Sequence, residues 1–151
     1  MFRGINPINL DPKGRFAMPT RYRDRIAEVC DSQLIATIDT QDRCLWIYPL
    51  PQWEQIEAKL MELPTYDPVA RRIQRLLLGH ATELDIDAAG RVLLPQALRD
   101  YALLDKKIVL IGQGKRFELW SEDVWNQQRD AYLEVASKDI GSSAQIMSLV
   151  L

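Results

Sequence analysis

Two stretches of this chain, 76 residues apart, carry nearly the same residues. Residues 11–25 align with residues 87–101 without a gap and share six identities: Asp, Gly, Arg, Pro, Arg and Asp. The likeness continues downstream, where Leu-Trp-Ile-Tyr at 45–48 parallels Phe-Glu-Leu-Trp at 117–120. Such a duplication predicts two half-domains that share one core, because a single hairpin and a short helix are too small to bury a core alone.

The repeats divide the chain into four segments. We expect repeat 1 at residues 5–52, a helical connector at 53–80, repeat 2 at 81–124, and a C-terminal helix and tail at 125–151. The 151 residues are nearly half apolar and carry charges of both signs, which is typical of one soluble globular protein.

Several classes of protein are disfavoured by the composition. The chain opens without the apolar stretch of a secretory signal, and no apolar run reaches membrane-spanning length. Cys30 and Cys44 have neither the number nor the spacing of a disulfide framework or a zinc site. We therefore expect a cytoplasmic protein with no membrane partner, no metal and no cofactor.

Each repeat begins with a predicted turn. Asp-Pro-Lys-Gly at residues 11–14 matches type I turn preferences, and Gly14 and Gly90 are expected at positive φ. Alternating apolar residues on both sides of each turn predict a hairpin. Pro19 and Pro95 then predict the start of short helices, over residues 19–28 and 95–102.

A second hairpin follows in each repeat. We expect strands 34–38 and 45–48 in repeat 1, and strands 108–111 and 117–120 in repeat 2, the latter pair joined by a turn that includes Gly112-Gln113-Gly114. The expected helices are 51–63, a connector helix capped by Asp67 with Val69, Ile73, Leu76 and Leu77 as its apolar stripe, and a helix from Glu122 to about residue 133 that Ser121 caps. Residues 137–151 show little periodicity and predict a weakly structured tail.

Positive charge is concentrated in the first repeat. Residues 1–26 have a net charge of +4, whereas the corresponding residues 79–102 have −2. If the chain contacts phosphate, the first copy should make most of the contacts, because affinity for a nucleic-acid backbone follows clustered cations. A solvated charged face is the alternative for such a cluster, and also for Arg71, Arg72 and Arg75 on the connector helix.

The sequence resembles the MraZ family of bacterial transcriptional regulators over essentially its whole length. The resemblance depends on five segments: Met1-Phe2-Arg3-Gly4, the Asp11/Arg15 and Asp87/Arg91 signatures, Tyr48-Pro49-Leu50-Pro51, and Arg75-Leu76-Leu77-Leu78-Gly79-His80-Ala81. It implies an α+β fold in which two AbrB-like hairpin repeats exchange strands within one chain to form a small β-barrel with flanking helices.

The resemblance also implies a function. Members of the family assemble into rings and bind direct repeats in double-stranded DNA upstream of a division and cell-wall gene cluster, generally as repressors. We therefore expect a nucleoid-associated, ring-shaped homo-oligomer that is not an enzyme. The leading alternative is a protein-interaction module of the AbrB-like antitoxin type, whose tail would contact the partner.

The expected DNA-binding residues lie in and near the two signatures. Arg15 and Arg91 carry the family role by position, charge alone adds Arg3, Lys13, Arg21 and Arg23, and the turns are shaped by Asp11, Gly14, Asp87 and Gly90. Asp11 could instead hold Arg15 only to stabilise the hairpin, although exposed ion pairs contribute at most about 1 kcal/mol. Arg91, which has acidic neighbours, stays open between DNA binding and a structural or subunit contact.

No catalytic constellation is recognisable in the sequence. His80 is the only histidine and has no neighbouring nucleophile, so we interpret it as structural. Asp85 and Asp87 lack further metal ligands nearby in the sequence. The tryptophans recur beside apolar residues in both repeats, which favours packing over base stacking; they are Trp46, Trp53, Trp120 and Trp125.

Overall fold

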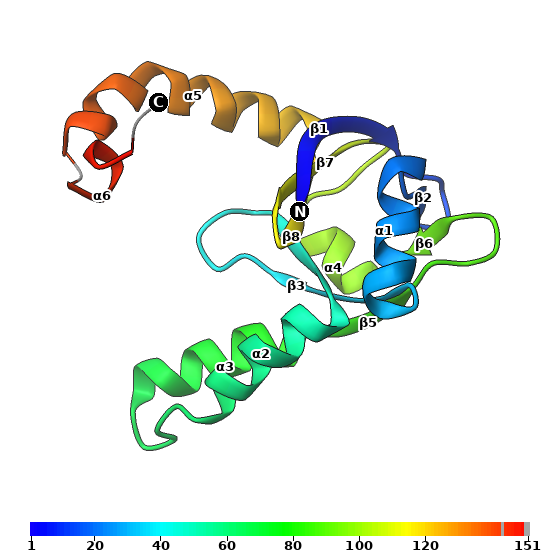
Figure 1. The fold of residues 1–151 in the computed structure, drawn as a ribbon, viewed down its shortest axis with the longest axis horizontal. Coiled ribbons are helices and arrows are strands. Elements are labelled where there is room, and N and C mark those ends of the chain that lie inside the picture. Colours follow the sequence, from blue (N-terminus) through cyan, green and yellow to red (C-terminus); the bar gives the residue numbers. More distant parts are fainter. Residues whose placement is uncertain (143, 150–151) are drawn as a thin grey trace.

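The structure, a computed structural model, describes residues 1–142 and 144–149. Within these residues it has a six-stranded sheet, a two-stranded sheet and six helices (Figure 1), which confirms the α+β class. The strands are β1 (Phe2–Asn9), β2 (Arg15–Ala17), β3 (Gln33–Ile38), β4 (Leu45–Pro49), β5 (Thr82–Asp85), β6 (Arg91–Leu93), β7 (Lys107–Gly114) and β8 (Arg116–Ser121). The helices are α1 (Thr20–Cys30), α2 (Leu50–Met61), α3 (Pro68–His80), α4 (Gln96–Tyr101), α5 (Glu122–Ser142) and α6 (Ala144–Met147).

Each repeat supplies one hairpin to the centre of the larger sheet. β3 pairs with β4 and β7 pairs with β8, both antiparallel, which confirms the two hairpins expected from the apolar runs. The hairpins join through β4 and β8, and the strand order is β1-β7-β8-β4-β3-β5. The turn expected at Gly112 and Gln113 is wrong, because both residues lie within β7. This strand pairs with β1 as far as Gly114.

The first strand of each repeat pairs with the hairpin of the other repeat. β1 lies along β7, and β5 lies along β3. The short strands β2 and β6 pair with each other. The hairpin expected around each Asp turn is confirmed only next to the turn. The N–H of each aspartate donates to the carbonyl of its arginine, and Ile86 forms an isolated antiparallel bridge with Val92. The strands that continue from the turns pair elsewhere. The expected closure of all these strands into a small β-barrel stays a prediction.

The strand registers place the two repeats about a pseudo-twofold axis. Phe16 faces Val92 in the two-stranded sheet, and Trp46 faces Glu118 in the larger sheet; both are pairs of equivalent positions in the two repeats. The main core lies between the sheets and draws on both halves, so neither half would bury it alone. Its fully buried members include Phe16, Met18, Ile26, Leu45, Ile47, Val92, Leu94, Leu98, Ile108, Leu110, Phe117 and Leu119.

A proline precedes the first helix of each repeat. The sequence predicts that these helices begin at Pro19 and Pro95, but α1 and α4 begin one residue later, and both prolines are the extended residues before them. An N–H at such a position would have no partner within the helix, so proline costs nothing there. Buried Ile26 of α1 and Leu98 of α4 then hold the helices against the core.

The connector forms a helical hairpin on the outer face of the β3–β4 hairpin. Trp53 and Leu60 of α2 pack there with Ile73 and Leu77 of α3. Asp67 caps α3 as expected, because its Oδ1 accepts a hydrogen bond from the Val69 N–H at 2.9 Å. The expected apolar stripe of α3 is correct at Ile73 and Leu77 but wrong at Val69 and Leu76, which are exposed; the shorter Ala70 is buried instead. Arg71, Arg72 and Arg75 are exposed, as expected.

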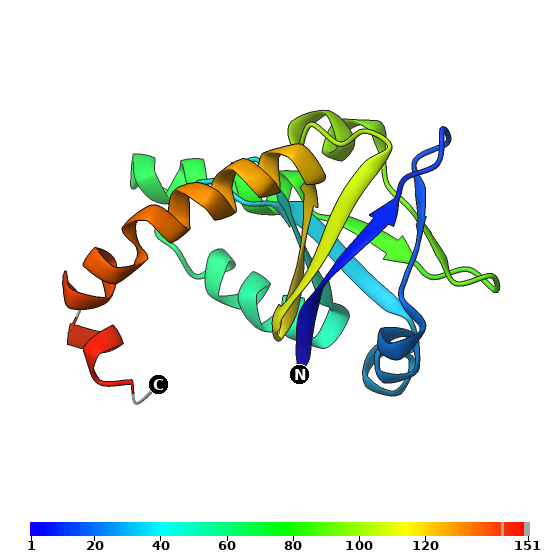
Figure 2. The ribbon, with the colours of Figure 1, turned by 90° about the horizontal axis from the view of Figure 1, so that it is seen from above.

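The last long helix extends beyond the expected boundary. α5 runs to Ser142 and α6 follows, so a weakly structured tail from residue 137 is wrong over these residues. No proline follows Pro95, and Glu134, Ala136 and Lys138 favour helix. Figure 2 shows α5 projecting from the rest of the chain. Residues 143, 150 and 151 of the expected tail lie outside the described residues. Among the helices described, none is both long and apolar enough to span a bilayer.

Candidate nucleic-acid interface

Residues 11–14, called turn 1 below, are organised by the side chain of Asp11. The Gly14 N–H donates to the Asp11 carbonyl at 2.9 Å, and the Asp11 N–H donates to the Arg15 carbonyl at 2.8 Å. Oδ1 of Asp11 accepts from the N–H groups of Lys13 and Arg15 at 2.9 and 2.8 Å. Its Oδ2 accepts from Nε of Arg15 at 2.7 Å. One carboxylate thus fixes both the turn and the direction of the arginine.

Residues 87–90, called turn 2 below, repeat the backbone arrangement with a looser arginine. Oδ1 of Asp87 accepts from the N–H groups of Ala89 and Arg91 at 2.9 and 2.8 Å. Oδ2 of Asp87, however, lies 3.5 Å from Nε of Arg91. That Nε is buried and has no hydrogen-bond partner within the described residues. The two turns therefore share a backbone arrangement but differ in the arginine. A hydrogen bond from Nε orients Arg15, whereas Nε of Arg91 makes no such bond within the described residues.

Both turn aspartates are held in their charged form. The pKa of Asp11 is lowered mainly by the hydrogen bond from the Arg15 backbone N–H, and the pKa of Asp87 is lowered mainly by the bond from the Arg91 N–H. Each turn therefore presents a carboxylate beside a guanidinium group at neutral pH, and the carboxylate is occupied by hydrogen bonds from its own turn.

A second arginine reaches each turn from the opposite repeat. Arg99 of α4 donates from Nε to the Leu94 carbonyl at 3.1 Å, and its side chain covers Gly14. Arg23 of α1 donates from Nε to the Met18 carbonyl at 2.7 Å, and its side chain covers Gly90. Turn 1 therefore combines Arg15 with Arg99, and turn 2 combines Arg91 with Arg23.

Glycine is required at both turns by backbone conformation and by space. Gly14 has φ +88° and Gly90 has φ +80°, which confirms the expected positive φ. A Cβ at position 14 would lie 2.6 Å from Cζ of Arg99, and a Cβ at position 90 would lie 2.7 Å from Nε of Arg23. The missing side chain thus lets a guanidinium group lie against the backbone of the turn.

The two turns lie at opposite ends of the β2–β6 ribbon. The Leu94 N–H donates to the Gly14 carbonyl at 2.8 Å, and the Met18 N–H donates to the Gly90 carbonyl at 2.9 Å, so each turn is tied to the other repeat. Figure 2 shows turn 1 in blue and turn 2 in green protruding on the side of the molecule away from α5. The arrangement presents two arginine pairs on one side of the chain.

The structure separates the residues that the sequence grouped by charge. Lys13 is exposed beside Arg15 in turn 1, as expected. Arg23 belongs to turn 2, although it comes from repeat 1. Arg3 and Arg21 lie elsewhere, in a hollow beside Gly4. Sequence reasoning missed Arg99, and the signal that could have found it was its alignment with Arg23.

Arg15 is accessible to a ligand. Its side chain retains 29% of its exposure, so it is not enclosed in the core. Its two terminal nitrogens have no hydrogen bond or ion pair within residues 1–142 and 144–149, because only Nε is engaged by Asp11. A planar guanidinium group held in this way can donate two parallel hydrogen bonds to a phosphate or to the edge of a guanine.

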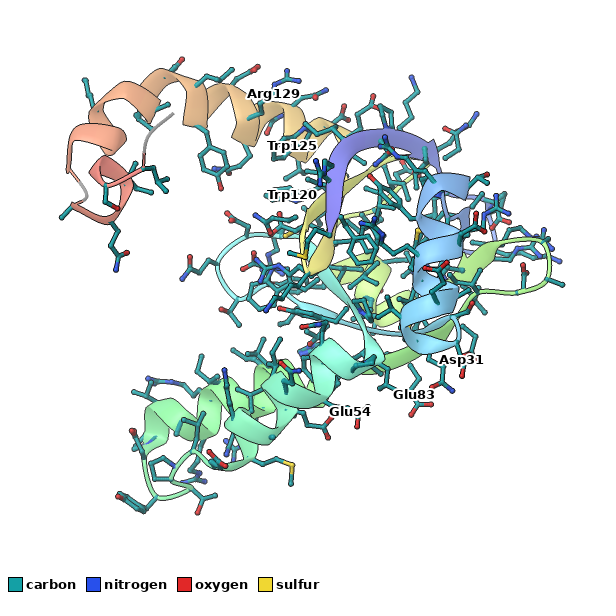
Figure 3. The ribbon with its side chains drawn as sticks, viewed as in Figure 1. Asp31, Glu54, Glu83, Trp120, Trp125 and Arg129 are labelled. Atoms are coloured by element: carbon teal, nitrogen blue, oxygen red, sulfur yellow. The ribbon has the colours of Figure 1, made fainter. Side chains whose placement is uncertain are left out.

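The tryptophans mainly serve packing. Trp53 and Trp120 are buried, and the rings of Trp120 and Trp125 meet edge to face with centroids 5.5 Å apart. Figure 3 shows this pair where α5 leaves the sheet. Trp46 lies under the guanidinium group of Arg116, at 4.4 Å from its ring centroid to Cζ. These contacts favour the packing interpretation over base stacking.

One buried group has ligand types suited to a metal. Asp39, Cys44 and Glu118 bring one ligand atom each to within 4.8 Å of one another. Asp39 already accepts bonds from the N–H groups of its own loop, and Glu118 accepts from Nε1 of Trp120 at 3.0 Å. Burial raises the pKa of the Cys44 thiol, which disfavours the thiolate that a metal requires. We interpret the group as a hydrogen-bonded support of the β3–β4 loop.

Comparisons with known proteins agree with the duplication. The model of a family described as "MraZ protein, putative antitoxin-like" matches the chain twice, over residues 1–76 and 77–144. A protein of Alkalilimnicola ehrlichii named transcriptional regulator MraZ is 56% identical over the full length of both chains. Proteins of the same name from Halorhodospira halophila and Coxiella burnetii are 53% and 56% identical, over 100% and 88% of each chain.

Proposed function

This chain belongs to the MraZ family, and on that premise we propose that it is a sequence-specific DNA-binding regulator of transcription that catalyses no reaction. The names of its relatives support regulation of transcription. The observation that carries the DNA-binding part is the composite turn: a firmly oriented arginine of one repeat beside a guanidinium group that crosses over from the other repeat.

Turn 1 is suited to recognising DNA because its cations are oriented before binding. Asp11 holds Arg15 through Nε, which leaves the terminal nitrogens for phosphate or a base edge. Arg99 lies against the same turn, and Lys13 adds a third cation. Ordering these side chains in advance reduces the entropy lost on binding.

Turn 2 is proposed as a weaker contact of the same kind. Arg23 of repeat 1 lies on turn 2, which therefore has two arginines. The difference in charge between the two turns is thus smaller than the difference between the two sequence windows. Ala89 stands where turn 1 has Lys13, and Arg91 lacks the Nε hydrogen bond of Arg15. Arg91 therefore contributes charge with less defined orientation.

We further propose that several copies of the chain act together. A ring-shaped homo-oligomer would present many composite turns to direct repeats on one duplex, and linked binding raises apparent affinity without any new contact. Bound at a promoter of the division and cell-wall gene cluster, such a ring would repress by excluding polymerase. We also propose that the chain is divided into the segments 5–52, 53–80, 81–124 and 125–151, and that its strands close into a small strand-exchanged β-barrel. We place the protein in the cytoplasm, at the nucleoid.

The antitoxin-type alternative rests on less. It requires a tail that is free to contact a partner, whereas residues 137–142 belong to α5. The description of the family still carries the word antitoxin-like. Removal of the C-terminal tail discriminates the two functions, because a DNA-binding regulator should still shift its promoter fragment.

The test is to replace Arg15 by alanine. We expect Arg15→Ala to lose most binding to a fragment carrying the repeats upstream of the protein's own reading frame, while oligomer size and melting temperature stay nearly unchanged. Arg72→Ala removes the same charge from an exposed position on α3 and serves as the control. Gel shifts with intact and scrambled repeats measure the binding. Equal loss in both variants, or unfolding of Arg15→Ala alone, would contradict the proposed role.

A further inference from the structure

A third arginine lies on a glycine outside the two turns. Arg21 of α1 covers Gly4 of β1, which has φ +109°, and a Cβ at position 4 would lie 2.6 Å from Nη2 of Arg21. The amide side chain of Asn6 accepts a hydrogen bond from this guanidinium group. The contact repeats the arrangement of Arg99 on Gly14 and Arg23 on Gly90, but it lies outside the two Asp–Arg signatures.

Two more arginines line the same hollow. It has a volume of about 240 Å³ and is lined by Met1, Arg3, Arg21, Tyr22 and Arg25. Arg25 donates from Nη1 to the Met1 carbonyl at 2.5 Å. The Tyr22 hydroxyl donates to the carbonyl of Arg3, which fixes the strand beside α1. Three arginine residues therefore line one hollow.

These three charges have no anionic partner in the described part of the chain. Arg15 and Arg91 each have an aspartate within ion-pair distance, whereas Arg21 and Arg25 donate to neutral oxygens only. No ion pair involves Arg3 within residues 1–142 and 144–149. Like charges held together raise the energy of the free protein, and a bound anion would lower it.

The hollow is distinct from turn 1 and is confined to repeat 1. Arg3 and Asn9 are six positions apart along the extended strand β1, which places them about 20 Å apart. The positions equivalent to Arg3, Arg21 and Arg25 in repeat 2 are Gly79, Ala97 and Tyr101. The pseudo-twofold axis therefore generates no second copy of this cluster.

We infer that the Arg3–Arg21–Arg25 hollow is a phosphate-binding site. Its most direct ligand is a backbone phosphate of the duplex that the turns contact, a use that rests on the proposed function. A free phosphate anion has the same chemistry. A site without aspartate and without Arg15 would add affinity for DNA irrespective of its sequence, because phosphate contacts position a protein and base contacts give specificity.

The test uses the full-length chain and the double variant Arg21→Gln/Arg25→Gln. Glutamine keeps a hydrogen-bond donor at each position and removes the charge. Arg71→Gln/Arg72→Gln makes the same charge change on α3 as the matched control. Arg3→Gln is the second variant, since no hydrogen bond of the Arg3 side chain supports the fold of the described residues.

Two measurements separate the sources of phosphate. The first is the affinity for the promoter fragment over a range of salt concentrations. We expect the slope of log affinity against log salt to fall by about 0.9 for each phosphate that the variant no longer neutralises, with the ratio of intact to scrambled repeats unchanged. The second is the rise in melting temperature on adding inorganic pyrophosphate at constant ionic strength, which we expect to disappear in both hollow variants.

Each outcome has a defined meaning. A smaller salt slope in the hollow variants alone supports the backbone-phosphate site. Loss of the pyrophosphate effect alone supports a site for the free anion. Wild-type protein that fails to bind the fragment but responds to pyrophosphate would refute the proposed function and leave the phosphate site standing. Variants that match the control in both measurements would overturn the inference.

Discussion

The two turns show which parts of a signature fix the backbone and which fix the arginine. In both, the aspartate accepts the same two backbone N–H bonds, and the glycine has positive φ. They differ in the guanidinium group, since Nε of Arg15 lies 2.7 Å from its aspartate and Nε of Arg91 lies 3.5 Å from its own. The shared residues thus specify the backbone of the turn, whereas the distance between the arginine Nε and the aspartate depends on the surrounding residues.

The comparison also shows how interleaving redistributes charge. The sequence places Arg23 in the basic repeat and Arg99 in the acidic one, yet each lies on the turn of the other repeat. A net charge summed over a sequence window therefore describes neither turn. The clearest difference between the repeats is instead the Arg3–Arg21–Arg25 hollow, which repeat 2 lacks.

The largest effect is expected where the two repeats meet on the pseudo-twofold axis. Phe16 and Val92 face each other there and both are buried. Phe16→Ala should lower the free energy of unfolding by about 3–5 kcal/mol, because it removes a large side chain and leaves a cavity. Val92→Ala should lower it by about 2 kcal/mol, since fewer methyl groups are removed. Urea unfolding at one protein concentration measures both values. Equal losses would contradict this order, because each atom removed from Val92 would then contribute more than each atom removed from Phe16.

Local features of the fold could be predicted from the sequence. The turns at Asp11 and Asp87, the two central hairpins and the Asp67 cap depend on residues within a few positions of each other. The partners of β1 and β2 could not be predicted, because alternating apolar residues fit any neighbouring strand. The extent of α5 was missed since its last turns carry no clear apolar periodicity.

The candidate site was predicted in part for the same reason. Asp11 and Arg15 meet because the turn brings residues four apart together. The contact of Arg99 with Gly14 joins residues 85 positions apart, and it depends on the exchange of strands. Arg21 was grouped with Arg15 by charge, although its helix and strand direct it towards Gly4. Their roles in binding DNA stay predictions.

A smaller effect is expected when either turn glycine is replaced. Gly14→Ala and Gly90→Ala should each lower the free energy of unfolding by about 1–2 kcal/mol, because alanine is disfavoured at positive φ. The new methyl group also displaces the arginine above it, so DNA affinity should fall with stability.

A double-mutant cycle separates the two causes. Arg99→Ala combined with Gly14→Ala removes the displaced side chain, and Arg23→Ala does the same for Gly90→Ala. A coupling energy near zero at both turns would mean that the arginines do not lie on the glycines. Coupling at turn 1 alone would show that only Arg99 is firmly placed.

The smallest effect is expected in the pH dependence of stability. The pKa of each turn aspartate is lowered in the folded state from its ordinary value of 3.8, so the folded protein favours the carboxylate. This contribution is fully present above that value and is lost as the pH falls through the lower pKa of the folded state. Asp11→Asn should therefore flatten the decline in stability below about pH 4. Asp87→Asn should flatten it less, because Nε of Arg91 is farther from its carboxylate than Nε of Arg15. Urea unfolding at a series of acidic pH values measures the slopes, with Asp130→Asn on α5 as the control. A larger change for Asp87→Asn than for Asp11→Asn would reverse the order of the two turns, since it would mean that the longer Arg91 contact is the stronger one in solution.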